Sequence, residues 1–343
     1  MDDEGATMRI GMIGLGRIGA FHARNLLTLP GVDSLVVADA APGVAERTAE
    51  RLGCEAADSA DGVLRSGIDA VLIAAATDAH PQLLLAAVDA GLPTFCEKPV
   101  AASPAAAIHV RDRLAGSGVP VQIGYPRRFD PAFVAARAAV LSGELGRLTT
   151  VRSTTLDPAP PPAGYLAVSG GIFADCAIHD FDAIRWVTGR EVTEVYATGS
   201  IDATAGPELF ADNNDVSTAA CILTMDDGTL GLVSNTRYNA SGYDVRLEVH
   251  GSADSVAAGW DDGAPIRSTT PGARFPAGPP HTFFMDRLAD AFTAELLTFL
   301  EVAAGRIESP CTVADALETS WVAEAATISL REHRPVALAE IRR

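Results

Sequence analysis

The first third of the chain alternates short apolar runs with segments of helical length. A short apolar run bounded by turn residues predicts a buried strand. Strands that alternate with helices at this spacing predict βαβ units. We therefore expect an α/β domain with a parallel sheet over residues 1–124. Its strands are predicted at Arg9–Ile13, Leu35–Ala38, Ala70–Ala75, Thr94–Cys96 and Val119–Ile123, and its helices at Ala20–Leu29, Val44–Leu52, Ala79–Ala90 and Pro104–Leu114.

The pattern changes after Gly124, where β-rich runs follow one another across short turns. Asp226-Asp227-Gly228 is typical of a hairpin turn, and residues 259–280 are rich in Gly and Pro and predict a loop. We expect an α+β domain over residues 125–343 with a mostly antiparallel open sheet. Its strands are predicted at Val151–Thr155, Val192–Gly199, Ser217–Met225, Thr229–Ser234 and Val245–His250, and its helices at Phe283–Ala303 and Val313–Leu330.

An acidic composition limits the partners that the protein can bind. Of 343 residues, 26 are Lys or Arg and 44 are Asp or Glu, which gives a net charge of −18. Nucleic acids and anionic membrane surfaces are recognised by basic faces, so we expect neither as a partner. Hydrophobic residues make up 48% of the chain, which is typical of a soluble globular protein rather than a disordered one.

Three further features favour a cytoplasmic location. No apolar run reaches the roughly 18 residues that span a bilayer. The acidic start, Met1–Glu4, lacks the basic and apolar regions of a secretion signal. The five cysteines are odd in number, widely spaced and without a CxxC motif. We therefore expect reduced thiols rather than disulfides or a zinc site.

A glycine motif, Gly14-Leu15-Gly16-Arg17-Ile18-Gly19, follows the first predicted strand and opens the first predicted helix. In this context Gly14 makes a tight turn, Gly16 lets the backbone approach a pyrophosphate, and Gly19 permits close packing of helix on strand. The N-terminus of the helix adds N–H groups and a positive dipole end. The motif predicts a Rossmann-type dinucleotide-binding domain. The alternative is a tight turn without a ligand.

Asp39 indicates which dinucleotide is bound. It lies twenty residues after Gly19 and ends the second predicted strand, where a carboxylate accepts hydrogen bonds from the adenosine ribose. A 2′-phosphate would meet this negative charge, and the next residue, Ala40, supplies no cation. We therefore predict NAD rather than NADP as the cofactor.

Two further segments carry candidate catalytic groups. Glu97-Lys98-Pro99 follows a predicted parallel strand, and ligands bind at such strand ends. Lys98 could therefore reach a substrate hydroxyl, although a surface lysine is the common alternative. Asp175 and His179 are four residues apart in a predicted helix and would share one face. A carboxylate beside an imidazole is typical of a general acid/base pair, and an ordinary helix-face contact is the alternative.

The order and spacing of these elements resemble the glucose–fructose oxidoreductase/inositol dehydrogenase (Gfo/Idh/MocA) family, from about Met8 to about Leu338. Several stretches are most similar to myo-inositol 2-dehydrogenases. These stretches are Gln122–Asp130, Asp157-Pro158 with the proline run and Tyr165, Ser169–Asp182, and Gly242-Tyr243-Asp244. Pro126 departs from the Met or Asn that is common at its position in inositol enzymes, which bears on the choice of substrate.

The resemblance implies NAD(P)-dependent oxidation of a ring hydroxyl. His179 would act as general base, Lys98 would hydrogen-bond the reacting oxygen, and Asp175 would orient the substrate. The polyol pocket would include Arg127, Asp157 and Tyr243. Alternatively, these three residues are a surface ion pair, a turn residue and a sheet residue. The implied cofactor-binding set is Gly14, Gly16, Arg17, Ile18, Gly19, Asp39, Thr77, His80, Glu97 and Lys98.

The family also implies a homo-oligomer, a dimer or tetramer, formed through the open face of the second sheet. The substrate could instead be another inositol isomer, an aldose or an aminocyclitol. The alternatives of another class are a non-catalytic NAD-binding regulatory protein and a glycosidase that retains its NAD. Asp180 and Asp182 next to His179 suggest a metal site at first sight, but the sequence offers no third ligand at a suitable spacing, so we expect no metal.

Overall fold

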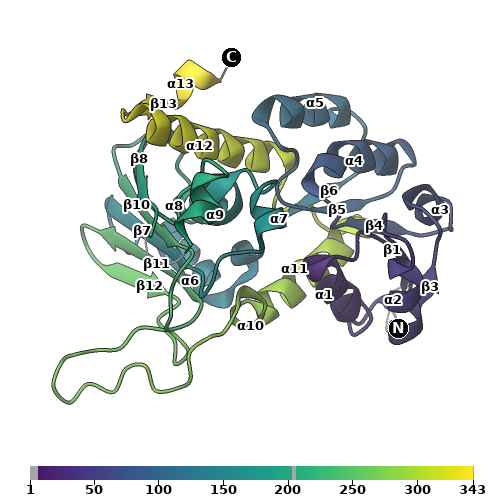
Figure 1. Cartoon of the computed structure of the whole chain (residues 1–343), viewed down its shortest axis with the longest axis horizontal. Coiled ribbons are helices and arrows are strands. Elements are labelled where there is room, and N and C mark those ends of the chain that lie inside the picture. Colours follow the sequence, from purple (N-terminus) through teal and green to yellow (C-terminus); the bar gives the residue numbers. More distant parts are fainter. Residues whose placement is uncertain (1–6, 203–205, 343) are drawn as a thin grey trace. The chain divides into compact units, whose positions relative to one another are not determined.

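The computed structural model describes residues 7–202 and 206–342, so the acidic start, Met1–Glu4, lies outside the described residues. The chain forms two compact units. The first contains the residues up to Tyr125 together with Phe292–Leu317, and the second contains Pro126–Ala291 and the residues from Glu318 onward. Each unit is built on one sheet (Figure 1).

The first unit contains a six-stranded, entirely parallel sheet in the order β3-β2-β1-β4-β5-β6. The strands are β1 (Met8–Ile13), β2 (Val32–Ala38), β3 (Glu55–Ala56), β4 (Ala70–Ile73), β5 (Thr94–Glu97) and β6 (Val121–Gly124). The helices are α1 (Arg17–Leu26), α2 (Val44–Leu52), α3 (Ala60–Leu64), α4 (His80–Asp89), α5 (Pro104–Leu114) and α11 (Ala289–Ala303). The prediction of an α/β domain with a parallel sheet is confirmed.

The central strands of this sheet, such as β4, are buried on both faces, which explains why they are continuous apolar runs. Ile10 and Met12 of β1 belong to a core that also contains residues of α1, α2 and α11. Between them Gly11 points to the other side, where a Cβ would lie 2.6 Å from Val63 of α3. Because all six strands are parallel, their carboxyl ends lie along one edge of the sheet. The candidate cofactor residues lie at this edge, directly after β1, β2, β4 and β5.

The second unit contains a seven-stranded sheet in the order β12-β11-β7-β10-β9-β8-β13. All neighbouring pairs are antiparallel except β7 and β10. The strands are β7 (Leu148–Leu156), β8 (Val192–Ser200), β9 (Thr218–Met225), β10 (Leu230–Thr236), β11 (Asp244–Gly251), β12 (Ser255–Ala258) and β13 (Val336–Ala337). The predicted mostly antiparallel sheet is confirmed, and β9 and β10 pair across the predicted Asp226-Asp227-Gly228 turn.

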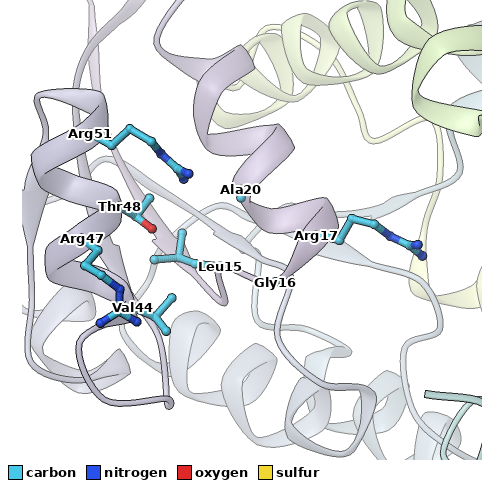
Figure 2. Close-up of a pocket in the computed structure, with 8 residues that line it drawn as sticks. All are labelled: Leu15, Gly16, Arg17, Ala20, Val44, Arg47, Thr48 and Arg51. Atoms are coloured by element: carbon cyan, nitrogen blue, oxygen red, sulfur yellow. The ribbon is translucent and has the colours of Figure 1, made fainter. Parts of the chain in front are cut away.

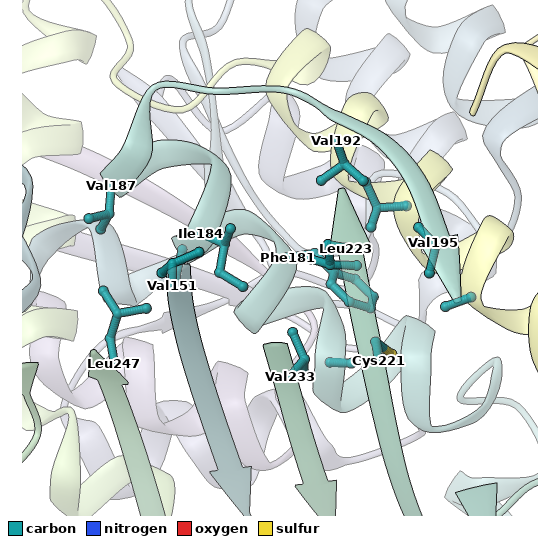
Figure 3. Packing of buried hydrophobic residues seen from close by; sticks show 14 of the residues in the cluster. Val151, Phe181, Ile184, Val187, Val192, Val195, Cys221, Leu223, Val233 and Leu247 are labelled. Carbon is teal, nitrogen blue, oxygen red and sulfur yellow. The ribbon is translucent and has the colours of Figure 1, made fainter. Parts of the chain in front are cut away.

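Helices cover one face of this second sheet. Phe181, Ile184 and Val187 of α8 pack against inward-facing strand residues such as Val233 and Leu223 (Figure 3). The helices of this unit are α6 (Pro131–Ser142), α7 (Ala163–Leu166), α8 (Ile178–Thr188), α9 (Pro207–Ala211), α10 (Phe284–Arg287), α12 (Val313–Glu332) and α13 (Leu338–Ile341). The strands alternate buried and exposed residues, as expected for a sheet with one covered face.

Two helical predictions need correction. The segment Phe283–Ala303 forms two helices, α10 and α11, because Leu288 leaves the helical conformation with φ −109° and ψ 19°. The Leu288 side chain is buried, so an apolar group is removed from water at this break between the two helices. Helix α6 is absent from the sequence prediction although Asp130 is a good N-cap and Pro131 suits the first position.

Among the described residues, no helix combines the length and the apolar character that a membrane crossing requires.

Candidate active site

The glycine motif joins the end of β1 to the first turn of α1. Gly14 has φ +93°, and a Cβ at this position would lie 2.5 Å from the backbone nitrogen of Ala75. A Cβ at Gly19 would overlap the carbonyl oxygen of Gly14. The backbone of the protein itself therefore requires these two glycines.

Gly16 differs from the other two because no protein atom restricts it. An added Cβ at Gly16 would have no heavy atom within 4 Å. Gly16 lies at the start of α1 (Figure 2), and the first turn, which begins with Arg17 and Ile18, contains no acidic residue. Open space at the N-terminus of a helix, next to a residue without a side chain, fits the pyrophosphate of a dinucleotide.

Asp39 follows β2 and its carboxylate is fixed by two backbone amides. Oδ2 accepts a hydrogen bond from Leu15 N–H at 2.6 Å, and Oδ1 accepts one from Ala41 N–H at 2.8 Å. The carboxylate is half-buried beside the glycine motif. Each carboxylate oxygen can accept a further hydrogen bond, so the group is suited to receive the two ribose hydroxyls of a bound adenosine.

Thr77 and His80 lie in the segment after β4. Thr77 begins a 3₁₀ turn, and His80, which is buried, begins α4. The His80 ring lies between two carbonyl oxygens, with Nδ1 2.8 Å from that of Pro99 and Nε2 3.0 Å from that of Ala75. His80 therefore ties the loop after β4 to the loop that carries Lys98.

The Glu97-Lys98-Pro99 tripeptide leaves the carboxyl end of β5. Glu97 is buried, and its Oε1 lies 2.6 Å from Nε2 of the fully buried His22 on α1. The interaction anchors the residue before Lys98 inside the unit, so His22 and Glu97 act as a support for this loop. Lys98 itself is half-buried. It is the only lysine in the chain, whose other 25 basic residues are arginines.

Asp175 and His179 lie in a helical segment that begins with a π-helical turn and continues as an α-helix. Asp175 is within a π-helical turn, Phe173–Ala177, and His179 is in the first turn of α8. The predicted helix through both residues is present, but its part around Asp175 is a π-helical turn and not a regular α-helix. A π-helical turn widens the helix locally and is often found at functional sites. Both side chains are half-buried, and Tyr165 donates a hydrogen bond from its hydroxyl to Asp175 Oδ1 at 2.8 Å.

Arg237 is a candidate site residue that the sequence did not reveal, because it contacts two predicted site carboxylates. Its Nη1 donates to Asp157 Oδ2 at 2.8 Å, and its Nη2 donates to Asp175 Oδ2 at 2.7 Å. The arginine side chain is only 5% exposed. Burial opposes the charge of Arg237, but the neighbouring carboxylates of Asp175 and Asp157 outweigh this effect and raise the pKa of Arg237. One permanently charged group thus joins two predicted site carboxylates, from which it is separated by 80 and 62 residues in the sequence.

The topology explains this arrangement. Strands β7 and β10 are parallel neighbours with Thr236 opposite Leu156, so Arg237 and Asp157 leave the sheet side by side. Asp157 N–H donates to the Thr236 carbonyl at 2.8 Å, and Asn239 N–H donates to the Asp157 carbonyl at 2.7 Å. The only sequence signal for Arg237 was its position shortly after the predicted strand Thr229–Ser234, and the use of that signal required knowledge of the strand pairing.

Arg127 is buried, so the alternative interpretation of this residue as part of a surface ion pair does not hold. Its Nη1 donates to Asp180 Oδ1 at 2.7 Å, and its Nη2 donates to Thr155 Oγ1 at 2.6 Å. Asp180 also accepts hydrogen bonds from Asn235 and Ser153. An Arg127 guanidinium that bonds to β7 and α8 in this way stabilises the packing of the helix on the sheet.

Like Asp180, Asp182 is the partner of a buried arginine. Arg128 Nη2 donates to Asp182 Oδ1 at 2.6 Å. Both aspartates that suggested a metal site are therefore bound to arginines. Within residues 7–202 and 206–342, no group of three His, Cys, Asp or Glu side chains is arranged to hold a metal ion.

Tyr243 precedes β11 and is buried, with its ring edge against Phe284 at a centroid distance of 6.3 Å. Burial raises the pKa of the Tyr243 hydroxyl, so this group stays protonated and can donate a hydrogen bond. Its backbone N–H donates to the carbonyl of His281, at the end of the long loop that follows β12. Tyr243 therefore joins the start of a strand to this loop.

The fold and the glycine motif define a dinucleotide-binding protein of the Rossmann type. Comparison with known families gives two matches. Residues 8–125 match an oxidoreductase family with an NAD-binding Rossmann fold, and residues 133–257 match the GFO/IDH/MocA C-terminal domain. The chain belongs to the Gfo/Idh/MocA family of oxidoreductases, and its cofactor is NAD.

Relatives match the chain along most of its length. A myo-inositol dehydrogenase of Streptomyces leeuwenhoekii is 40% identical over 88% of this chain and 90% of its own length. A myo-inositol 2-dehydrogenase of Thermotoga maritima is 36% identical over 97% of this chain and 99% of its own. Among solved structures, scyllo-inositol dehydrogenase of Lactobacillus casei with bound NAD(H) and scyllo-inositol has a TM-score of 0.85, with 28% identity over 97% of this chain and 99% of its own.

Proposed function

We propose that the protein is an NAD-dependent dehydrogenase that oxidises one hydroxyl of a cyclic polyol to a ketone, with the 2-hydroxyl of myo-inositol as the first candidate. Similarity along almost the whole chain to inositol dehydrogenases from several bacteria carries the proposal. The carboxylates of Asp157 and Asp175 support it, because carboxylate oxygens accept hydrogen bonds from the hydroxyls of an uncharged polyol.

We propose that His179 removes the proton from the reacting hydroxyl, because imidazole accepts protons near neutral pH. Lys98 donates a hydrogen bond to the same oxygen and stabilises the negative charge that develops there. Asp175 orients the substrate and supports His179. When bound, NAD accepts the hydride that leaves the carbon. A single lysine in a chain that otherwise uses arginine supports a role for Lys98 that the planar guanidinium does not fulfil.

Asp157 and Tyr243 are proposed to contact the polyol, Asp157 as an acceptor and Tyr243 as a donor. For Arg127, the buried ion pair with Asp180 favours a supporting role beside β7. The cofactor contacts are proposed for Gly14–Gly19, Asp39, and the segments around Thr77, His80 and Glu97. In this proposal the buried contact between Glu97 and His22 fixes the backbone next to Lys98 and thereby positions the Lys98 side chain.

The scyllo isomer is the second candidate substrate. A scyllo-inositol 2-dehydrogenase of Bacillus subtilis is 34% identical over 96% of this chain, so relatives at comparable distances have names that differ in the isomer. Pro126 is buried at the start of a 3₁₀ turn next to Arg127, where it fixes the backbone beside this segment. A substitution at this position is therefore suited to influence which isomer is accepted.

The test is the formation of NADH with myo-inositol, scyllo-inositol, an aldose and an aminocyclitol as separate substrates. The variants Lys98→Arg and His179→Ala are expected to reduce kcat by about 10²-fold or more. The matched controls are Arg24→Lys and His109→Ala, which change exposed residues on α1 and α5. NAD binding without turnover of any cyclitol would contradict the proposal and favour a regulatory protein.

We also propose a cytoplasmic homo-oligomer. None of the five cysteines, all of which lie in the described part of the chain, forms a disulfide, as is usual in a reducing compartment. The outer face of the second sheet carries an apolar row in which Tyr196 lies opposite Ile222, and Ile222 lies opposite Leu232. Tyr196 and Ile222 are 38% and 47% exposed, so this row is suited to contact a second copy of the chain.

A further inference from the structure

A basic cleft lies between α1 and α2, next to the glycine motif. It has a volume of about 560 Å³. Gly16 and Arg17 are among its α1-side residues, and Arg47, Thr48 and Arg51 are among those from α2 (Figure 2). The side chains of Arg47 and Arg51 extend from α2 on the side of the cleft, whereas Arg17 points away from them.

Arg47 and Arg51 form a concentrated positive charge in an acidic protein. They are four residues apart on α2 and therefore lie on one face of the helix. Within the part of the chain that the structure describes, neither guanidinium forms an ion pair with a carboxylate. In the same unit Arg9 pairs with Glu55 at 2.6 Å. Two adjacent cations that form no ion pair favour an anionic ligand.

The cleft lies next to Asp39, the residue proposed to bind the adenosine ribose of the dinucleotide. Leu15 lines the cleft, and its N–H donates to Asp39 Oδ2 at 2.6 Å. Arg47 folds back over the loop after Asp39, because its Nη1 lies 2.5 Å from the place where a Cβ of Gly43 would be. Asp39 and Arg47 thus flank the same short loop. If Asp39 receives the two ribose hydroxyls, a phosphate on one of these oxygens would lie beside the loop that the Arg47 side chain covers.

We propose that this cleft is a latent binding site for a phosphate on the adenosine ribose, the 2′-phosphate that distinguishes NADP from NAD. Arg47 and Arg51 already supply the cations that such a phosphate needs. Asp39 excludes the phosphate by like-charge repulsion at short range. The preference for NAD therefore depends on one carboxylate, and removal of its charge is sufficient to admit the phosphate without an added basic residue.

The test measures binding of 2′,5′-ADP and 5′-AMP to the full-length protein by calorimetry at low ionic strength. Asp39→Asn keeps the size of the side chain and removes its charge. We expect it to increase the affinity for 2′,5′-ADP relative to 5′-AMP at least tenfold. The triple variant Asp39→Asn/Arg47→Gln/Arg51→Gln is expected to lose that gain, whereas Asp39→Asn/Arg24→Gln, which removes an exposed arginine of α1, keeps it.

An equal gain with and without Arg47 and Arg51 would overturn the proposal. A second measurement does not depend on changes at Asp39, whose backbone hydrogen bonds support the loop. With Asp39 intact, Arg47→Gln/Arg51→Gln should weaken 2′,5′-ADP binding at least threefold relative to 5′-AMP, and the difference should decrease with added salt. Equal ratios for the two proteins would also overturn it. Neither measurement depends on the identity of the polyol substrate, so failure here is distinguishable from failure of the proposed function.

Discussion

At the scale of single residues, Arg237 organises the proposed polyol-binding groups of the second unit. Two carboxylates close together repel each other, and partial burial makes the repulsion stronger. The guanidinium between Asp157 and Asp175 offsets this repulsion and fixes both groups at defined positions. Asp157 is 17% exposed and Asp175 11% exposed, so each retains an accessible part. The pair can therefore remain charged and still accept hydrogen bonds.

Replacing Arg237 should therefore affect polyol turnover as well as stability. Arg237→Gln leaves two carboxylates without their shared cation, and we expect a loss of about 3 kcal/mol in the free energy of unfolding, measured with urea. We also expect a decrease in kcat/KM for the polyol of at least about tenfold, with partial recovery in Arg237→Lys, which keeps the charge but not the planar fork.

Arg185→Gln is the matched control, because Arg185 is also buried and bonds to Glu191 and Thr319. This variant should lose a similar amount of stability without a change in KM for the polyol. If the KM values of the Arg237 and Arg185 variants rise together, Arg237 has only a structural role.

At the scale of elements, helix ends are fixed by side chains that the sequence displays. Ser103 caps α5 by accepting a hydrogen bond from Ala106 N–H at 3.3 Å, in agreement with the predicted helix start. Asp130 caps α6 in the same way, with Oδ1 3.0 Å from Ala132 N, but its Oδ2 also accepts a hydrogen bond from Arg287 at 2.6 Å. Asp130 thus joins a helix to a segment that is more than 150 residues away in the chain.

Loss of Asp130 should therefore cost more than loss of an ordinary cap. Asp130→Ala removes the cap of α6, a loss of about 1 kcal/mol, and leaves the half-buried Arg287 without its ion pair to Asp130. We expect a total of about 3 kcal/mol in urea denaturation, against about 1 kcal/mol for Ser103→Ala. Asp130→Asn, which can still cap the helix, should be intermediate. Equal effects of Asp130→Ala and Ser103→Ala would show that the Arg287 pair contributes nothing.

At the scale of the whole molecule, net charge and the outer face of the second sheet have opposite effects on association. A charge of −18 on each copy causes repulsion, whereas burial of Tyr196, Ile222 and Leu232 favours contact. An oligomer formed through this face should therefore become more stable as salt is added, because salt screens the repulsion.

The variant Ile222→Glu tests this proposal, because it puts a charge in the centre of the apolar row. We expect light scattering to detect a shift toward the monomer, most clearly at low ionic strength. Val134→Glu is a control at another exposed apolar residue, on α6, and it should leave the mass unchanged. An unchanged mass for Ile222→Glu would mean that association uses a different surface.

Local patterns predicted much of the fold. The apolar runs, the hairpin turn and the Ser103 cap are properties of neighbouring residues, so they could be interpreted without strand pairing. The single-helix interpretation of Phe283–Ala303 failed because burial of Leu288 depends on packing rather than on helical periodicity. The π-helical turn at Asp175 was missed for a related reason, since sequence periodicity does not distinguish a local widening from a regular helix.

The Rossmann glycine motif, the position of Asp39 after a strand and the two-part fold class could all be predicted from the sequence, because each depends on short-range spacing. The surroundings of these residues depend on contacts between distant segments and became known from the three-dimensional structure. The structure distinguished Gly16, which protein atoms leave open, from Gly14 and Gly19, which the backbone requires. It also brought Arg237 to Asp157 and Asp175, because that contact depends on the parallel pairing of β7 and β10, which are separated by more than seventy residues.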